Sequence, residues 1–166
     1  MFELKRLTRQ AIPAALEKAE RYRLLNEPAE AESICLDVLA IEPGNQRALI
    51  TLLLALTDQF SEEVPGTHRR AEELLPHLAS EYDRAYYAGI VSERRAKALA
   101  SRSIPGSDSQ AYQGFLAAMQ WYERAEASRP AGNDDALLRW NRCARFLLAH
   151  PHLAPGPEER VEQPLE

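Results

Sequence analysis

The sequence has few of the features that mark disulfide-rich or membrane proteins. Only two of its 166 residues are cysteine, Cys35 and Cys143, and two lone cysteines make no disulfide framework. Both fall at apolar positions of helical stretches, where cysteine usually behaves as a small hydrophobe. The longest apolar segment, residues 48–56, covers nine residues, whereas a membrane-spanning helix needs ~20. A core helix and a reducing compartment are the simpler interpretations.

The charged residues are not arranged as in a secretory leader peptide or in a protein that binds nucleic acid. The chain has three lysines, no more than two adjacent basic residues and a formal net charge of −5, so no basic block favours nucleic acid. Residues 1–7 carry charge where a secretory signal needs its apolar stretch. We therefore predict a cytoplasmic protein without a nucleic-acid or membrane partner. Residues 151–166 are rich in Pro and Glu, which predicts an acidic, poorly ordered tail.

Signatures of catalysis and metal binding are missing as well. The chain has no Gly-rich phosphate loop, no Gly-x-Ser-x-Gly elbow, no Cys-x-x-Cys and no His-Glu-x-x-His. His68 and Glu72 have a four-residue spacing that suits metal ligands, as do Glu73 and His77, but this spacing is routine for solvated charge pairs on a helix. No pair of acidic residues has a sequence reason for a shifted pKa. We therefore predict a non-enzymatic protein that uses no metal and no cofactor.

Capping and breaking residues divide the chain into seven predicted helices and no strand. Pro13 and Pro28 suit first helical turns, and Asn45 suits a helix boundary. The predicted helices cover about 13–25, 28–42, 46–60, 67–80, 83–102, 107–128 and 133–149. A further short helix over residues 2–10 stays open, because a residue that precedes proline avoids helical angles.

A short pattern occurs twice among these helices. It reads Ala31-x3-Cys35-x2-Val38-x4-Pro43 in the second helix and Ala118-x3-Tyr122-x2-Ala125-x4-Pro130 in the sixth. Each copy puts small and mid-sized residues on one helical face and then ends the helix with proline. Such a face predicts close packing against a neighbouring helix, and two helices that end alike indicate a repeat.

The layout of helix, tight turn, helix and proline resembles the tetratricopeptide repeat, an antiparallel helix pair. The resemblance is clearest over residues 13–45 and 118–133. It implies an all-α fold, an α-solenoid of antiparallel helix pairs that forms one domain over residues 1–150. We therefore expect about seven helices stacked as consecutive pairs.

The spacing of the repeat departs from the family. The equivalent alanines Ala31, Ala71 and Ala118 are separated by 40 and 47 residues, whereas tetratricopeptide units run at about 34. The extra length falls in residues 61–67 and 103–109, which are rich in Pro, Gly and Ser and predict loops. A longer-period α-solenoid of the HEAT or armadillo kind and a non-repeat helical bundle therefore stay open.

The resemblance also implies where a partner would bind. Stacked pairs curve, so the first helix of each pair lines a concave groove that can hold a peptide or a partner helix. The predicted groove residues are Leu16, Glu20, Arg23, Ile50, Leu54, Thr57, Tyr86, Ile90, Arg94, Leu137, Asn141 and Arg145. Their apolar members favour an amphipathic partner. Of the Lys and Asn that the family's carboxylate clamp requires, only Asn141 stands in a suitable place, so we do not expect that function.

Two functions remain open. The first is an adaptor that binds another protein or peptide in the groove. The second is a structural role as a homodimer, in which apolar faces that include Trp121, Trp140 and Phe146 pair two copies. In that second case the groove is covered by the chain's own termini. The candidate covering residues are Phe2, Leu4 and Leu7, or Val161 and Leu165.

Overall fold

A computed structural model describes residues 1–156 of the chain, and residues 157–166 lie outside that part. The described residues form seven α-helices, four short 3-10 helices and no strand, which confirms the predicted all-α fold and its number of helices. The α-helices are α1 (Ile12–Leu24), α2 (Pro28–Ile41), α3 (Gln46–Asp58), α4 (Thr67–Leu74), α5 (Glu81–Ala100), α6 (Ser107–Ala127) and α7 (Asp135–Ala149).

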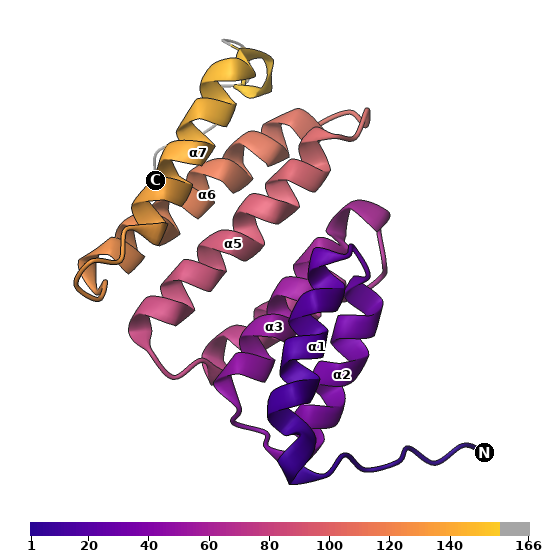
Figure 1. The fold of residues 1–166 in the computed structure, drawn as a ribbon. Coiled ribbons are helices and arrows are strands. Elements are labelled where there is room, and N and C mark those ends of the chain that lie inside the picture. Colours follow the sequence, from indigo (N-terminus) through magenta and orange to yellow (C-terminus); the bar gives the residue numbers. More distant parts are fainter. Residues whose placement is uncertain (157–166) are drawn as a thin grey trace, which may run out of the picture. The chain divides into compact units, whose positions relative to one another are not determined.

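The helices form two compact units. The first unit, residues 1–80, holds α1 to α4, and the second, from residue 81 onward, holds α5 to α7. Within each unit, helices that follow each other in the chain pack side by side as antiparallel neighbours (Figure 1). This pairing is the one expected of an all-α helical repeat. Within residues 1–156, none of the helices combines the length and the apolar character that crossing a membrane requires.

Local signals explain most helix boundaries. Asn26 has a left-handed φ of 60° in the turn after α1, and Pro28 is the first residue of α2, as the breaker sequence predicts. Asn45 caps α3, because its side chain accepts a 3.0 Å hydrogen bond from the backbone N–H of Ala48. The Asn45 cap satisfies one of the backbone N–H groups that the start of a helix leaves open.

The predicted helix over residues 67–80 is shorter in the structure. α4 ends at Leu74, and a 3-10 helix covers Leu75–His77. Pro76 causes the change, because it lacks the backbone N–H that would continue the α-helical hydrogen bonds. At the N-terminus, only Arg9–Ala11 forms a short 3-10 helix, so residues 2–8 are not helical.

The first unit has its core between α1, α2 and α3. Ile12 and Leu16 of α1 pack with Val38 of α2 and Ala48 of α3, and all four are buried. Ala31 and Cys35, which share the predicted packing face of α2 with Val38, are fully buried as well. The core therefore uses the close-packing pattern that the sequence predicts.

Close contact between α5 and α6 defines the second unit. Gly89 of α5 faces the ring of Tyr122 in α6, and a Cβ at position 89 would lie 2.7 Å from Tyr122 Cδ1. Gly114 of α6 faces Ala96 of α5, where an added Cβ would lie 2.9 Å from the alanine Cβ. Glycine at both positions lets the two helices approach more closely than larger side chains allow. Ala118, Tyr122 and Ala125, the second copy of the repeated pattern, are fully buried.

One turn occurs in both units. Residues 64–67 (Val-Pro-Gly-Thr) and 104–107 (Ile-Pro-Gly-Ser) each precede a helix, and their glycines have a φ of 78° and 82°. Proline at the second position and a positive-φ glycine at the third are typical of a type II turn. The N–H of the fourth residue donates to the carbonyl of the first, at 3.4 Å in the first turn and 3.0 Å in the second.

The two turns also set the spacing of the repeat. They lie 40 residues apart in the sequence, as do Ala71 and Ala111, which occupy the same place in the helix that follows each turn and are both fully buried. The sequence analysis paired Ala71 with Ala118 instead. Ala111 and Ala118 are seven residues apart, hence on the same face of α6, which explains why either fits the pattern.

Candidate functional site

Four of the six groove residues predicted in the first unit lie where α1 packs on α3. On α3, the residues at 47, 50, 54 and 58 follow each other at spacings of three and four, so they share one helical face. We call this region the α1/α3 seam. Its members are Glu20 and Arg23 of α1 and Arg47, Ile50, Leu54 and Asp58 of α3.

Two arginine–carboxylate pairs bracket the seam. Arg47 donates to Glu20 through Nε at 2.6 Å and Nη2 at 2.8 Å, and both side chains are exposed by nearly half. The hydrogen bond from Arg47 lowers the pKa of Glu20, against a smaller opposing effect of burial. Arg23 donates to Asp58 at 2.7 and 3.2 Å, and these side chains are only 20% exposed. Ile50 and Leu54, both half-buried, occupy the α3 face between the pairs.

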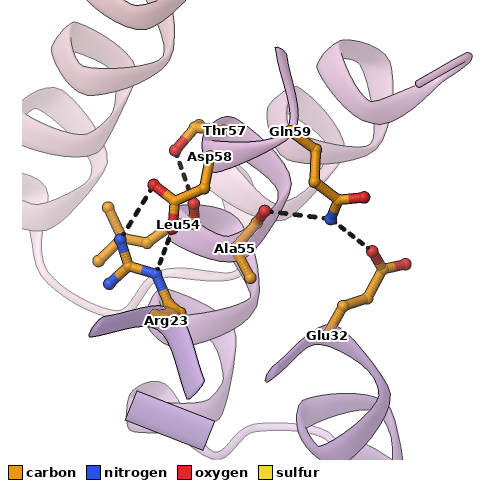
Figure 2. A network of polar contacts seen from close by, with 7 residues as sticks. All are labelled: Arg23, Glu32, Leu54, Ala55, Thr57, Asp58 and Gln59. Carbon is orange, nitrogen blue, oxygen red and sulfur yellow. Dashed lines mark hydrogen bonds and ion pairs between the residues drawn. The ribbon is translucent and has the colours of Figure 1, made fainter. Parts of the chain in front are cut away.

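Further polar contacts hold the end of α3 (Figure 2). Gln59 donates through Nε2 to the carbonyl of Ala55 at 3.1 Å and to Glu32 of α2 at 2.9 Å. Glu32 also accepts a 2.5 Å hydrogen bond from Arg70 of α4. The contacts join α2, α3 and α4, and the Arg23–Asp58 pair adds α1, so side chains from all four α-helices of the first unit hold this end of the seam.

Leu16 and Thr57 were predicted to line the groove, but both are buried. Leu16 is 3% exposed within the core of the first unit, so it belongs to the packing face of α1. Thr57 is also 3% exposed, and its hydroxyl donates to the carbonyl of Leu54 at 2.8 Å. On α1, Leu16 thus belongs to the core. The first residue of the predicted groove that lies in the seam is Glu20, one helical turn further along.

The groove residues predicted in the second unit lie on α5 and α7, and their side chains differ in solvent exposure. On α5, Ile90 is only 1% exposed, so its side chain is not accessible to a partner in the predicted groove. Tyr86 and Arg94 are half-buried. On α7, Leu137 and Asn141 are half-buried and Arg145 is exposed.

The aromatic residues of the predicted dimer face have contacts within the second unit. Phe146 stacks on Phe115 with ring centroids 4.6 Å apart. The indole Nε1 of Trp140 donates to Glu123 at 3.0 Å. The guanidinium of Arg124 lies over the ring of Trp121, 4.7 Å from its centroid. The apolar N-terminal residues Phe2 and Leu4 are fully exposed and cover no groove, whereas Val161 and Leu165 lie outside the described residues.

A buried charged network in the second unit escaped the sequence analysis. The Glu93 side chain of α5 is 0% exposed and accepts a 2.6 Å hydrogen bond from the Tyr122 hydroxyl. Lys97 pairs with it along the same helix, and Arg139 of α7 lies 3.5 Å away. Burial acts to raise the pKa of Glu93, but the hydrogen bonds from Lys97 and Tyr122 outweigh it, so the pKa is lowered. Glu93 is therefore a buried carboxylate that stays ionised.

A second missed feature is an apolar groove on the first unit, which we call the α1/α2 groove. It has a volume of about 300 Å³ and lies beside the N-terminal half of α1. It is lined by Leu7, Ala11, Ala14, Ala15, Lys18, Ile34 and Asp37. The alanines at 11, 14 and 15 have helical spacing and share one face of the chain here, which was a usable signal for this groove.

Nothing in the described part of the chain is arranged for metal or thiol chemistry. No group of three or more His, Cys, Asp or Glu residues within residues 1–156 is placed to hold a metal ion. Burial raises the pKa of Cys35 and of Cys143 to about 12, so both thiols stay protonated near neutral pH, as expected of structural cysteines.

Comparisons with known proteins add no assignment. No protein-family model matches the chain, and no curated protein or solved structure matches it. The tetratricopeptide resemblance therefore stays a prediction from the residues.

Proposed function

We propose that this chain is a non-enzymatic interaction module of the cytoplasm that binds an amphipathic peptide or helix of another protein at the α1/α3 seam. The observation that carries the proposal is the half-buried pair Ile50 and Leu54, which lies between two bidentate arginine–carboxylate pairs. A helix that is otherwise buried at Leu49, Leu52 and Leu53 thus keeps two large apolar side chains partly accessible.

The chemistry of the seam suits a partner with an apolar stripe between charges. A helix laid on such a surface places residues at i, i+3, i+4 and i+7 against the apolar centre. Glu20 and Arg47 are exposed by nearly half at one end, so they can form charged contacts with the partner's rim. Nucleic acid and membrane lipid are not part of the proposal, because the seam carries both signs of charge in pairs.

The test first selects peptides that bind the chain and then measures their affinity for the wild type and for matched variants. A displayed library of random peptides is selected on the whole chain, and the selected peptides are titrated against the wild type, Leu54→Glu and Leu24→Glu. Leu24 is an exposed leucine at the end of α1, so its variant controls for the new charge. We expect Leu54→Glu to weaken binding at least about tenfold, which a loss of ~1.4 kcal/mol produces, and Leu24→Glu to leave it unchanged.

A second variant keeps the test decisive if Leu54→Glu fails to fold. Arg47→Glu changes an exposed residue and places two carboxylates at one end of the seam without touching the core. Circular dichroism establishes that each variant is folded. Equal binding by the wild type and every folded seam variant contradicts the proposal.

A further inference from the structure

The α1/α2 groove is backed by the core and open on its outer side. Leu7 and Ala15, which line it, also pack against the buried cluster of the first unit. Its rim carries one charge of each sign, Lys18 from α1 and Asp37 from α2. An apolar groove on a rigid helix pair, with polar residues at its edge, is typical of a docking site.

An apolar arm lies directly before the groove in the sequence. Residues 1–8 are not helical, and Phe2 and Leu4 are exposed at 101% and 91%. In an extended chain, alternate side chains point to the same side, so Phe2 and Leu4 share one face while Glu3 and Lys5 share the other. The arm therefore presents a short apolar strip at positions 2 and 4, which ends at Arg6 on the same face, with Glu3 and Lys5 behind it.

We propose that the α1/α2 groove binds the N-terminal arm of a second copy of this chain, and that the exchange of arms forms a two-fold dimer. With Phe2 and Leu4 against the apolar lining, Glu3 and Lys5 face outward at the edge of the groove, where Lys18 and Asp37 offer one opposite charge to each. Because groove and arm belong to the same chain, the contact is self-complementary and occurs twice in the dimer. The inference does not depend on the proposed function, which uses the α1/α3 seam.

The arm suits the groove of a second copy better than its own. Leu7 already lines the groove of its own chain, and the chain continues from there into α1. To place Phe2 in the same groove, the arm would have to reverse within residues 3–6. Residues 1–8 contain no Gly, Pro, Asn or Asp, the residues that favour tight turns. An extended arm, which spans roughly 17 Å from position 2 to position 7, reaches a second copy without a turn.

The mass in solution tests the dimer. Light scattering across a range of concentrations is expected to show a mass that rises from one to two times 18.7 kDa. Two variants should shift the association: the arm variant F2S/L4S and the groove variant A14E. Each is expected to raise the dissociation constant at least about tenfold, because F2S/L4S removes the large apolar side chains that the groove would bury and A14E places a charge in the apolar groove.

Ala29→Glu is the matched control for the groove variant. Ala14 and Ala29 are both exposed alanines in the first turn of a helix, where an acidic residue is well tolerated, but only Ala14 lines the groove. We expect Ala29→Glu to associate like the wild type. Because all substituted residues are exposed, the variants should remain folded by circular dichroism.

Mixing the two variants distinguishes exchange between copies from other arrangements. A complex of one arm variant and one groove variant retains one intact arm and one intact groove, so a tagged arm variant should capture the groove variant. Neither variant should capture a second copy of itself at the same concentration. A monomer at every concentration, dimerisation that A14E leaves unchanged, or a mixture without capture would each overturn the proposal.

Discussion

The hydroxyl of Tyr122 on α6 donates a 2.6 Å hydrogen bond to Oε2 of Glu93 on α5, inside the second unit. Burial raises the pKa of Tyr122, and the neighbouring negative charge of Glu93 raises it further, so the phenol stays a donor. A buried carboxylate is costly unless it is hydrogen-bonded and paired, and Glu93 has Tyr122, Lys97 and Arg139 around it. The network joins the three α-helices of the unit.

The first prediction concerns the charge of Glu93. Glu93→Gln keeps the shape of the side chain but leaves Lys97 and Arg139 without their carboxylate. We expect a loss of roughly 1.5–3 kcal/mol in the free energy of unfolding at pH 7, the range for hydrogen bonds to charged groups. Urea denaturation measures the loss. Glu17→Gln, at an exposed position of α1, serves as control and should change the value by less than about 0.5 kcal/mol.

The same variant has a predicted pH dependence. The pKa of Glu93 is lowered in the folded protein from an ordinary value of 4.5, so its ionised form stabilises the fold above that pH. This contribution is lost as the pH falls below 4.5 and through the folded-state pKa. The difference in stability between the wild type and Glu93→Gln should therefore be constant near neutral pH and shrink in acid. A difference that stays constant down to pH ~3 would show that the charge of Glu93 contributes nothing.

The second prediction concerns the close contact of α5 and α6. In Gly89→Ala the new methyl group would overlap the Tyr122 ring, which is fully buried and held by Glu93. Alanine favours a helix over glycine by up to ~1 kcal/mol, but overpacking costs about 1–3 kcal/mol, so we expect a net loss of stability. Thermal unfolding measures it. Gly44→Ala is the control, because Gly44 has an ordinary φ and no atom within 4 Å of an added Cβ.

Helix positions were predictable from sequence because their signals are local. Pro28 and Asn45 act on their own backbone and on the next three residues, so they can be interpreted without knowing the fold. The early end of α4 at Leu74 has an equally local cause in Pro76, which the prediction extended past. The other helix boundaries differ from the predicted ones by no more than two residues.

The site was less predictable because it depends on which residues meet across helices. A helix turns 100° per residue, so Leu16 and Glu20 differ little in direction, and only packing shows that the first is core and the second is seam. In the sequence, nothing near Glu93 distinguishes it from a solvent-exposed glutamate. Its burial depends on Tyr122, 29 residues later, and on Arg139, 46 residues later, and no local pattern reports such contacts.

The third prediction concerns the turn that occurs in both units. Gly66 and Gly106 have positive φ values, and neither has an atom within 4 Å of an added Cβ, so an alanine there is penalised by backbone conformation alone. We expect Gly66→Ala and Gly106→Ala each to cost about 1–2 kcal/mol. Asparagine tolerates the left-handed region better than alanine, so the two Gly→Asn variants should cost less. Chemical denaturation of all four variants measures this, and equal losses for Ala and Asn would argue against a conformational cause.

The last prediction compares the two ion pairs of the α1/α3 seam by double-mutant cycles. The Arg47–Glu20 pair is exposed by nearly half on each side, so water screens it and its coupling energy should be small. Arg23 and Asp58 are 20% exposed and less screened by water, so their coupling should be larger. Added salt should reduce the first coupling more than the second, because exposed charges are screened more strongly. Alanine variants of all four residues, measured by urea denaturation at low and high salt, give both couplings. If the coupling energy of Arg47–Glu20 is the larger of the two, or the less sensitive to salt, burial does not determine which ion pair is stronger.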